Sequence, residues 1–523
     1  MRKSGGYGVH KSFGAAVAVF VALWIAPAAL QAQAGPPAGG APSSAIQLPL
    51  SGRTGQSGTV ATVQNALPGG VQSVNTLSST VQVQGAYAGG VPSTEAPGAP
   101  LPLSLTEAIR RGLQYNLGTV GFQNSIRQAQ GQRWAELSLL LPNLNGSLIG
   151  TEEQVNLAAF GFKFQSPIPG FSIPTVVGPF HYFDLRARLT QTVANLTTLR
   201  NYRATGETLR ATQLSAQDAR DLVVLAVTGG YLSIISAAAR IDSARAQVAT
   251  AQATYQQAVD RHNAGVTARI DVTRSQVELQ TQQQRLTSQE TDYAKQKIQL
   301  GRVIGLPPGQ DFTLSDAIPY APLTDLTLDQ ALIRAAANRS DLKAAQAQVQ
   351  AAQLVRQAAV AERYPSAEFA SDYGVIGTSP TSSHGTFTVT GTLRFPIWQG
   401  GRVHADIEIA DSALQQRRAE YEDLRGRIDA DVRQAFLDLT AAASQVTVSQ
   451  SNRDLAQDTL AQARDRFAAG VADTIEVVQA QEAVAAAEQD YISSLYAHNL
   501  AKASLARAMG QAEQGIQQLL GRP

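Results

Sequence analysis

The side chains with the clearest chemical potential are three aspartates, Asp454, Asp458 and Asp465, spaced i, i+4 and i+11. In an α-helix this spacing places all three on one face, because the helix turns once every ~3.6 residues. Carboxylates arranged in rings around a symmetry axis bind cations and narrow a channel. If several chains assembled around a symmetry axis, these aspartates would form an acidic aperture ring. The competing interpretation is an ordinary solvated helix face.

No arrangement typical of catalysis accompanies these carboxylates. The six histidines are scattered, no HExxH motif occurs, and no Gly-rich phosphate loop lies between a strand and a helix. The chain has no cysteine, which excludes thiolate chemistry, disulfides, Cys–zinc sites and a lipidated Cys. The net charge of +1 gives no basic surface for nucleic acid. We therefore expect no enzyme activity, no cofactor, no metal site and no nucleic-acid partner.

A second group of charges lies in segments where polar and apolar residues alternate. Period two is typical of a β-strand with one apolar and one polar face. Four such segments occur, at about 142–155, 180–195, 365–376 and 385–397. A soluble antiparallel sheet and a transmembrane β-barrel both fit this pattern. In a barrel, the charges expected to face the lumen are Asp184, Arg186, Arg188, Glu368 and Asp372.

Four strands cannot close a barrel by themselves. An open sheet edge in lipid leaves backbone groups without partners, at several kcal/mol each, and known barrels begin at about eight strands. The barrel hypothesis therefore requires several chains to share their strands. A monomer that stays dissolved without detergent would contradict it.

The elements that position these residues are duplicated. Residues 103–142 reappear at 326–365 with a constant shift of 223, and farther along the chain the shift is 205. We therefore expect a first structural repeat over 101–323 and a second over 324–512. Apolar residues at four-three spacing predict long coiled-coil helices at about 199–262, 269–304, 402–467 and 474–509. A helix over the first of these segments would reach ~95 Å.

Two short turns join the predicted long helices, and each contains a glycine suited to closing a helix in the left-handed conformation. They lie at the end of the hairpins farthest from the strands. A family resemblance, given below, implies that these tips dock a partner, with Arg261 and Arg466 holding the local geometry. The simpler alternative is a turn needed only for folding. The predicted tip residues are Arg261, Gly265, Val266, Arg466, Gly470 and Val471.

The remaining segments have other compositions. Residues 1–34 combine early positive charge, an apolar run and Ala32-Gln33-Ala34, which predicts a cleavable export signal. Residues 35–100 are rich in Gly, Pro and Ser and are expected to be mostly disordered. Residues 513–523 form a C-terminal tail. After the signal we expect no apolar window long enough for a membrane-spanning helix.

Both copies of the tip motif carry a family resemblance. The first reads Arg261-x-x-x-Gly265-Val266-x-x-x-x-Asp271-Val272-x-x-x-Gln276, and the second repeats this from Arg466 to Gln481. Together with the export signal and the duplicated helix–strand–helix plan, the motif resembles the TolC-like outer-membrane efflux proteins (outer-membrane factors). The likeness covers about 101–512.

This resemblance implies an α+β membrane protein that assembles as a homotrimer. Three chains would form a 12-stranded β-barrel in outer-membrane lipid, continuing into a long periplasmic α-helical barrel. The tips would meet a periplasmic adaptor, or membrane fusion protein, linked to an inner-membrane pump. The chain would then be a passive exit duct for efflux or type I secretion in a Gram-negative bacterium. The alternative is a soluble periplasmic coiled-coil scaffold. The sequence does not reveal the transported substrate: drugs, metal cations and proteins all fit.

Overall fold

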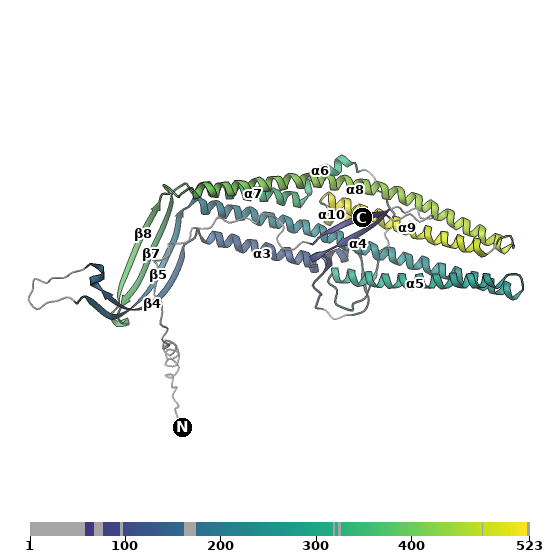
Figure 1. The fold of residues 1–523 in the computed structure, drawn as a ribbon, viewed down its shortest axis with the longest axis horizontal. Helices are drawn as coiled ribbons and strands as arrows, with labels where there is room; N and C mark the ends of the chain where they lie inside the picture. Colours follow the sequence, from purple (N-terminus) through teal and green to yellow (C-terminus); the bar gives the residue numbers. More distant parts are fainter. Residues whose placement is uncertain are drawn as a thin grey trace, which may run out of the picture. The chain divides into compact units, whose positions relative to one another are not determined.

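The computed structural model describes residues 58–66, 77–94, 98–161, 174–316, 320–322, 326–472 and 474–519. The predicted export signal at 1–34 lies outside the described residues. Two like series of elements make up most of the described chain (Figure 1). The first comprises α2 (Leu105–Tyr115), α3 (Leu117–Ser138), β4 (Asn143–Asn156), β5 (Val176–Ala194), α4 (Leu196–Asn263) and α5 (Arg269–Val303). The second comprises α6 (Leu328–Asn338), α7 (Ser340–Ala361), β7 (Ser366–Gly377), β8 (His384–Arg394), α8 (Arg402–Ala468) and α9 (Thr474–Ala508).

Smaller elements connect and flank the two series. A helix, α10 (Ala512–Leu519), follows the second series. Two short strands, β3 (Leu101–Leu103) and β6 (Phe312–Leu314), pair in parallel across the first series. The other short elements are the strands β1 (Val60–Ala66) and β2 (Leu77–Val83) and the 3₁₀ turns η1 (Gly85–Ala88), η2 (Leu157–Phe160) and η3 (Pro380–Ser382).

The four long strands form one antiparallel sheet in the order β4-β5-β7-β8. Leu148 pairs with Leu185 between β4 and β5, and Tyr373 pairs with Phe387 between β7 and β8. The sheet lies beyond one end of the long helices, and the α4–α5 and α8–α9 turns lie at the other end (Figure 1). The strands β4 and β8 are its two edges in the described chain.

Each sheet hairpin continues directly into a long helix. Asn195 caps α4, because its side chain accepts a hydrogen bond from the Thr198 backbone N–H at 3.1 Å. Before α8 the chain turns through Gly400 and Gly401, whose φ angles of +61° and +85° favour glycine. The two long hairpins, α4–α5 and α8–α9, therefore start after β5 and β8, which have β7 between them in the sheet.

Among the described residues, one helix, α4, is long and apolar enough to cross a membrane by length and composition. Its qualifying 18-residue window has a mean hydropathy of 2.0. The expectation that no such window follows the signal is therefore wrong. The run 222–239 carries no charge. It was missed because its Gly, Ser and Thr residues interrupt the apolar side chains. The window is 67% buried in the protein, and Val223, Val227 and Ile234 belong to the largest core cluster. In this structure the run is a core segment.

The expectation of disorder over 35–100 is wrong where the structure describes this segment. The strands β1 and β2 pair in register from Val60–Val83 to Ala66–Leu77. Val60, Val81 and Tyr87 pack into the same core cluster as α4. Composition alone missed this hairpin, because its stability comes from docking on a preformed helix surface and not from its own few apolar residues.

The predicted tail at 513–523 is also corrected, because α10 covers residues up to Leu519. Ile516 is fully buried in the core cluster. Arg220 of α4 forms an ion pair with Glu513 of α10 at 2.5 Å. The helix α10, which follows the second repeat, therefore packs on α4 of the first repeat.

A group of charges, buried except for the half-exposed Asp431, joins the two repeats near this point. Arg339, at the α6–α7 junction, donates to Asp341 at 2.6 Å and lies 3.7 Å from Asp431 of α8. Arg507 of α9 forms an ion pair with Asp218 of α4 at 2.6 Å. The network therefore ties α4, α7, α8 and α9 together in the interior.

Candidate functional site

The two tip turns have the same backbone geometry. Gly265 and Gly470 adopt φ angles of +74° and +75°. The N–H of Val266 donates to the Arg261 carbonyl at 2.9 Å, and the N–H of Val471 donates to the Arg466 carbonyl, also at 2.9 Å. This six-to-one bond, with the glycine in the left-handed conformation, is the Schellman closure of a helix. The turn leaves Val266 and Val471 70% and 71% exposed.

The two tip arginines have different partners. Arg261 crosses to the other hairpin: its guanidinium donates to the Phe467 carbonyl at 2.9 Å and lies 4.1 Å from the centre of the Phe467 ring. Arg466 stays within its own hairpin and forms an ion pair with Glu476 at 3.1 Å. Arg466 therefore braces one turn, whereas Arg261 joins the two tips.

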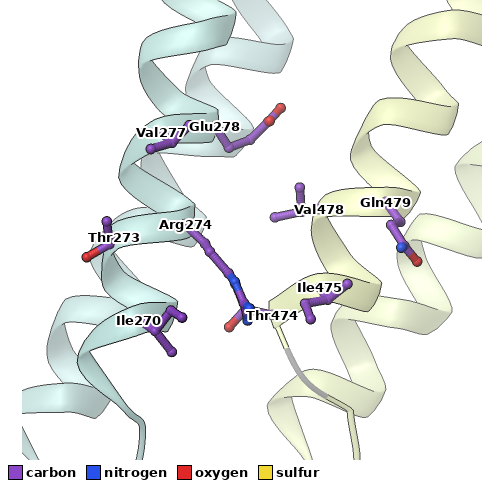
Figure 2. A pocket seen from close by; sticks show the side chains of 9 residues that line it. All are labelled: Ile270, Thr273, Arg274, Val277, Glu278, Thr474, Ile475, Val478 and Gln479. Carbon is purple, nitrogen blue, oxygen red and sulfur yellow. The ribbon is translucent and has the colours of Figure 1, made fainter.

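A groove runs between the first turns of α5 and α9, beside the tips (Figure 2). Its volume is about 510 Å³, and most of its lining is apolar. Ile270 and Ile475 face it from equivalent positions of the two repeats, separated by the shift of 205. Sequence reasoning missed this groove, although the isoleucine before the acidic residue in both motif copies was a usable signal.

The three predicted aperture aspartates lie on the exposed face of α8. This face is opposite the buried stripe that contains Ala463 and Phe467. Asp454 accepts a hydrogen bond from Arg453 at 2.7 Å, and this bond raises the pKa of Arg453. The charge of Asp454 is thus partly compensated, which leaves Asp458 and Asp465 as the stronger candidates for an acidic ring.

The structure brings three of the five predicted lumen charges together. Arg186 on β5 donates to Asp184 and to Asp372 of β7. Arg188 and Glu368 lie on the same sheet face, as the pairings Arg188–Asp372 and Thr192–Glu368 require. Both are exposed and lie outside this cluster.

The opposite face of the sheet is apolar and exposed. Phe387 is 75% exposed, and its neighbours on this face are also large apolar residues. Soluble surfaces rarely leave such a contiguous apolar patch uncovered. The face includes Leu144, Leu148, Leu185, Tyr373, Phe387, Val389 and Leu393.

The structure thus joins a sheet with one exposed apolar face to two long antiparallel helical hairpins. Residues 331–511 match the family model for outer membrane efflux protein. The predicted resemblance to TolC-like outer-membrane efflux proteins is confirmed, and so is the predicted outer-membrane location. Such relatives are efflux channels and not enzymes.

Two curated relatives share modest identity with this chain. The toluene efflux pump outer membrane protein TtgF of Pseudomonas putida is 26% identical over 330 residues, which is 60% of this chain and 64% of that protein. The probable outer membrane lipoprotein SilC of Salmonella typhimurium is 27% identical over 176 residues, which is 33% of this chain and 38% of that protein. The match thus spans less than two thirds of either relative.

Solved structures share the fold over more of the chain. The outer membrane protein VceC of Vibrio cholerae aligns with a TM-score of 0.65 at 18% identity, covering 78% of this chain and 96% of VceC. The CmeC outer membrane channel of Campylobacter jejuni aligns with a TM-score of 0.68 at 13% identity, covering 83% of this chain and 95% of CmeC.

Proposed function

We propose that this chain is one subunit of an outer-membrane exit duct. Three chains would each contribute the sheet β4-β5-β7-β8 to a single 12-stranded barrel, and their long helices would continue as a tunnel in the periplasm. The observation that carries the proposal is an exposed apolar sheet face combined with two unpaired edges, β4 and β8. In lipid, such edges are tolerated only when they pair, so β4 of one chain must meet β8 of the next.

In this proposal the duct works passively. The polar sheet face, with Asp184, Arg186 and Asp372, would line a watery lumen, and the apolar face would contact lipid. The tips and the groove between Ile270 and Ile475 would meet a periplasmic adaptor that connects to an inner-membrane pump. The pump would supply the energy and select the substrate, whether the system is an efflux pump or a type I secretion system.

Cysteine cross-linking tests the shared barrel. The chain has no cysteine of its own. Any disulfide must therefore form between the cysteines that are introduced. We expect oxidation to produce covalent dimers and trimers when Asn145→Cys or Ser147→Cys on β4 is combined with Thr388→Cys or Thr390→Cys on β8. A disulfide forms when the Cα atoms are about 4.4–6.8 Å apart, so at least one combination in the series should match the register between subunits.

The matched control moves one cysteine to an interior strand. Ala370 lies on β7 between β5 and β8, so Asn145→Cys with Ala370→Cys should give no ladder on denaturing gels. If no β4–β8 combination gives a ladder, or if the protein stays monomeric and soluble without detergent, the duct proposal fails. A soluble scaffold would then be the better account, although it leaves the apolar face uncovered.

The exposed aspartates of α8 are expected to set ion selectivity in the duct. In a trimer, Asp458 and Asp465 would each form a ring of three carboxylates, and such rings attract cations. We predict that Asp458→Ala/Asp465→Ala trimers in planar bilayers lose most of the wild-type preference for cations over anions. Asp454→Ala should change selectivity less, because Arg453 already compensates that carboxylate. Unchanged selectivity in the double variant would assign these residues to an ordinary wet helix face.

A further inference from the structure

A second cavity lies between the two long hairpins, above the groove at the tips. Its volume is about 300 Å³, and all four long helices, α4, α5, α8 and α9, contribute to its lining. Most of its lining is apolar, but polar side chains also reach it, among them Glu278 and Gln282 of α5 and Gln481 and Glu488 of α9. The cavity is partly open, so it has an entry path.

Three of these polar side chains are buried. Glu278, Gln282 and Gln481 are 7%, 2% and 7% exposed. Buried polar groups are normally paired, and a buried charge normally has a counter-charge. Here the carbonyl oxygens Gln282 Oε1 and Gln481 Oε1 have no hydrogen-bond partner.

The orientation of both amides follows from their bonds. Gln282 Nε2 donates to Glu278 Oε1 at 2.6 Å, so its carbonyl oxygen must be the free end. Thr254 donates its hydroxyl hydrogen to the Thr250 carbonyl, and its oxygen accepts from Gln481 Nε2 at 2.8 Å. The free end of Gln481 is therefore also an oxygen. Both side chains therefore have an unpartnered carbonyl oxygen at the cavity that they line.

The hydrogen-bond partner of the Glu278 carboxylate is the neutral amide of Gln282. Within the described residues Glu278 forms no ion pair. Arg274, the nearest arginine along α5, lies 3.8 Å from Asp271 instead. Figure 2 shows the Arg274 guanidinium directed toward Thr474, whereas the Glu278 carboxylate points away from it. On the far wall Glu488 accepts from Gln457 Nε2 at 2.8 Å. Arg453 lies near this carboxylate: its pKa is raised first by its hydrogen bond to Asp454 and also by the charge of Glu488.

We propose that this cavity binds a hard divalent cation of the Ca²⁺ type. The Glu278 carboxylate and the carbonyl oxygens of Gln282 and Gln481 would be its protein ligands, Glu488 would add a second negative charge, and water would complete the shell. Carboxylates and amide carbonyls are the ligands that Ca²⁺ takes, in a flexible geometry of six to eight oxygens, whereas Mg²⁺ demands a stricter octahedron. A bound cation would satisfy the buried charge and both free oxygens at once.

The ligands come from different repeats, which gives the site a structural consequence. Glu278 and Gln282 belong to the first hairpin, and Gln481 and Glu488 belong to the second. A cation bound between them joins the hairpins within one chain. The expectation that the chain has no metal site arose because these ligands lie about 200 residues apart and two of them are glutamines. In the described chain, moreover, no group of three or more His, Cys, Asp or Glu side chains is placed to hold a metal.

Calorimetric titration of the EDTA-treated, detergent-purified protein with CaCl₂ tests this proposal, and MgCl₂ serves as a second probe. We expect one Ca²⁺ site per chain, weaker binding of Mg²⁺, and a rise in the unfolding temperature on adding Ca²⁺. Glu278→Gln should weaken Ca²⁺ binding by at least about tenfold, because affinity follows the charge count of the ligands. Glu482→Gln is the matched control: its exposed side chain is one residue from Gln481, and binding should be unchanged.

A second variant covers the case in which Glu278→Gln does not fold. Gln481→Glu adds a carboxylate at the same wall and should strengthen Ca²⁺ binding. The proposal is overturned if the wild-type protein binds no Ca²⁺, or if Glu278→Gln binds it as tightly as the wild type does. None of these readouts requires channel activity, so the result is independent of the duct proposal.

Discussion

Transport is expected to fall to the level of a strain lacking the protein when Gly470 is replaced by aspartate, while the variant still assembles. A Cβ atom at Gly470 would meet no atom within 4 Å, so the substitution leaves the packing intact. The left-handed backbone costs an L-residue about 1 kcal/mol, and aspartate is among the residues that tolerate it best. The main effect is therefore a new negative charge beside the exposed Val471, on the surface proposed to dock the adaptor.

Drug or metal susceptibility of cells, together with gel analysis of the trimer, measures this effect. Gly470→Asn is the matched control, because asparagine accepts the same backbone conformation without a charge. It should retain most transport. If Gly470→Asp cells lose the trimer itself, the turn is needed only for folding. If they transport normally, the tip does not dock the adaptor through this turn.

Replacing Arg339 by leucine is expected to lower the free energy of unfolding by about 3–5 kcal/mol, the usual cost of removing one partner from a buried ion pair. The Arg339 side chain is 6% exposed, and its loss would leave the carboxylate of Asp341 without its 2.6 Å partner. Burial already raises the pKa of nearby Asp218, and the charge of Arg507 opposes that rise. Removing another positive charge therefore leaves a cluster of poorly compensated carboxylates in the interior.

Chemical denaturation followed by circular dichroism would measure this loss. Arg433 provides the control, since its ion pair with Asp429 lies on the exposed face of α8. Arg433→Leu should unfold at the wild-type denaturant concentration, because exposed pairs contribute little. Equal stability of the two variants would show that the network around Arg339 does not hold the repeats together.

Periodic patterns made the largest elements predictable. Alternation of Thr and apolar residues marked β8, and the apolar seam with four-three spacing marked α8, which begins at the expected Arg402. Such patterns survive in the sequence because each element must bury or expose one face along its whole length. Because the chain is duplicated, each pattern occurs twice at a constant offset. The turns at Gly265 and Gly470 could therefore be predicted from each other.

Features that depend on distant contacts were not predictable in this way. The β1–β2 hairpin lies in a Gly- and Pro-rich segment whose own composition predicts disorder, whereas in the structure Val60 and Val81 pack into the core cluster that contains α4. Asp431 lies 3.7 Å from Arg339, more than 90 positions away in the sequence, and no local pattern connects the two residues. The pairing of Arg261 with Phe467 likewise joins residues that no local pattern connects.

That last contact makes the duplicated loops unequal partners. Arg261 anchors the end of α4 on the end of α8, whereas Arg466 anchors only its own turn. A displacement of either loop is therefore expected to reach its neighbour through the Arg261 guanidinium, in addition to the Gln481–Thr254 bond farther along the hairpins. Within a subunit the α4–α5 and α8–α9 turns should therefore move together, so a protein that binds one turn would displace both.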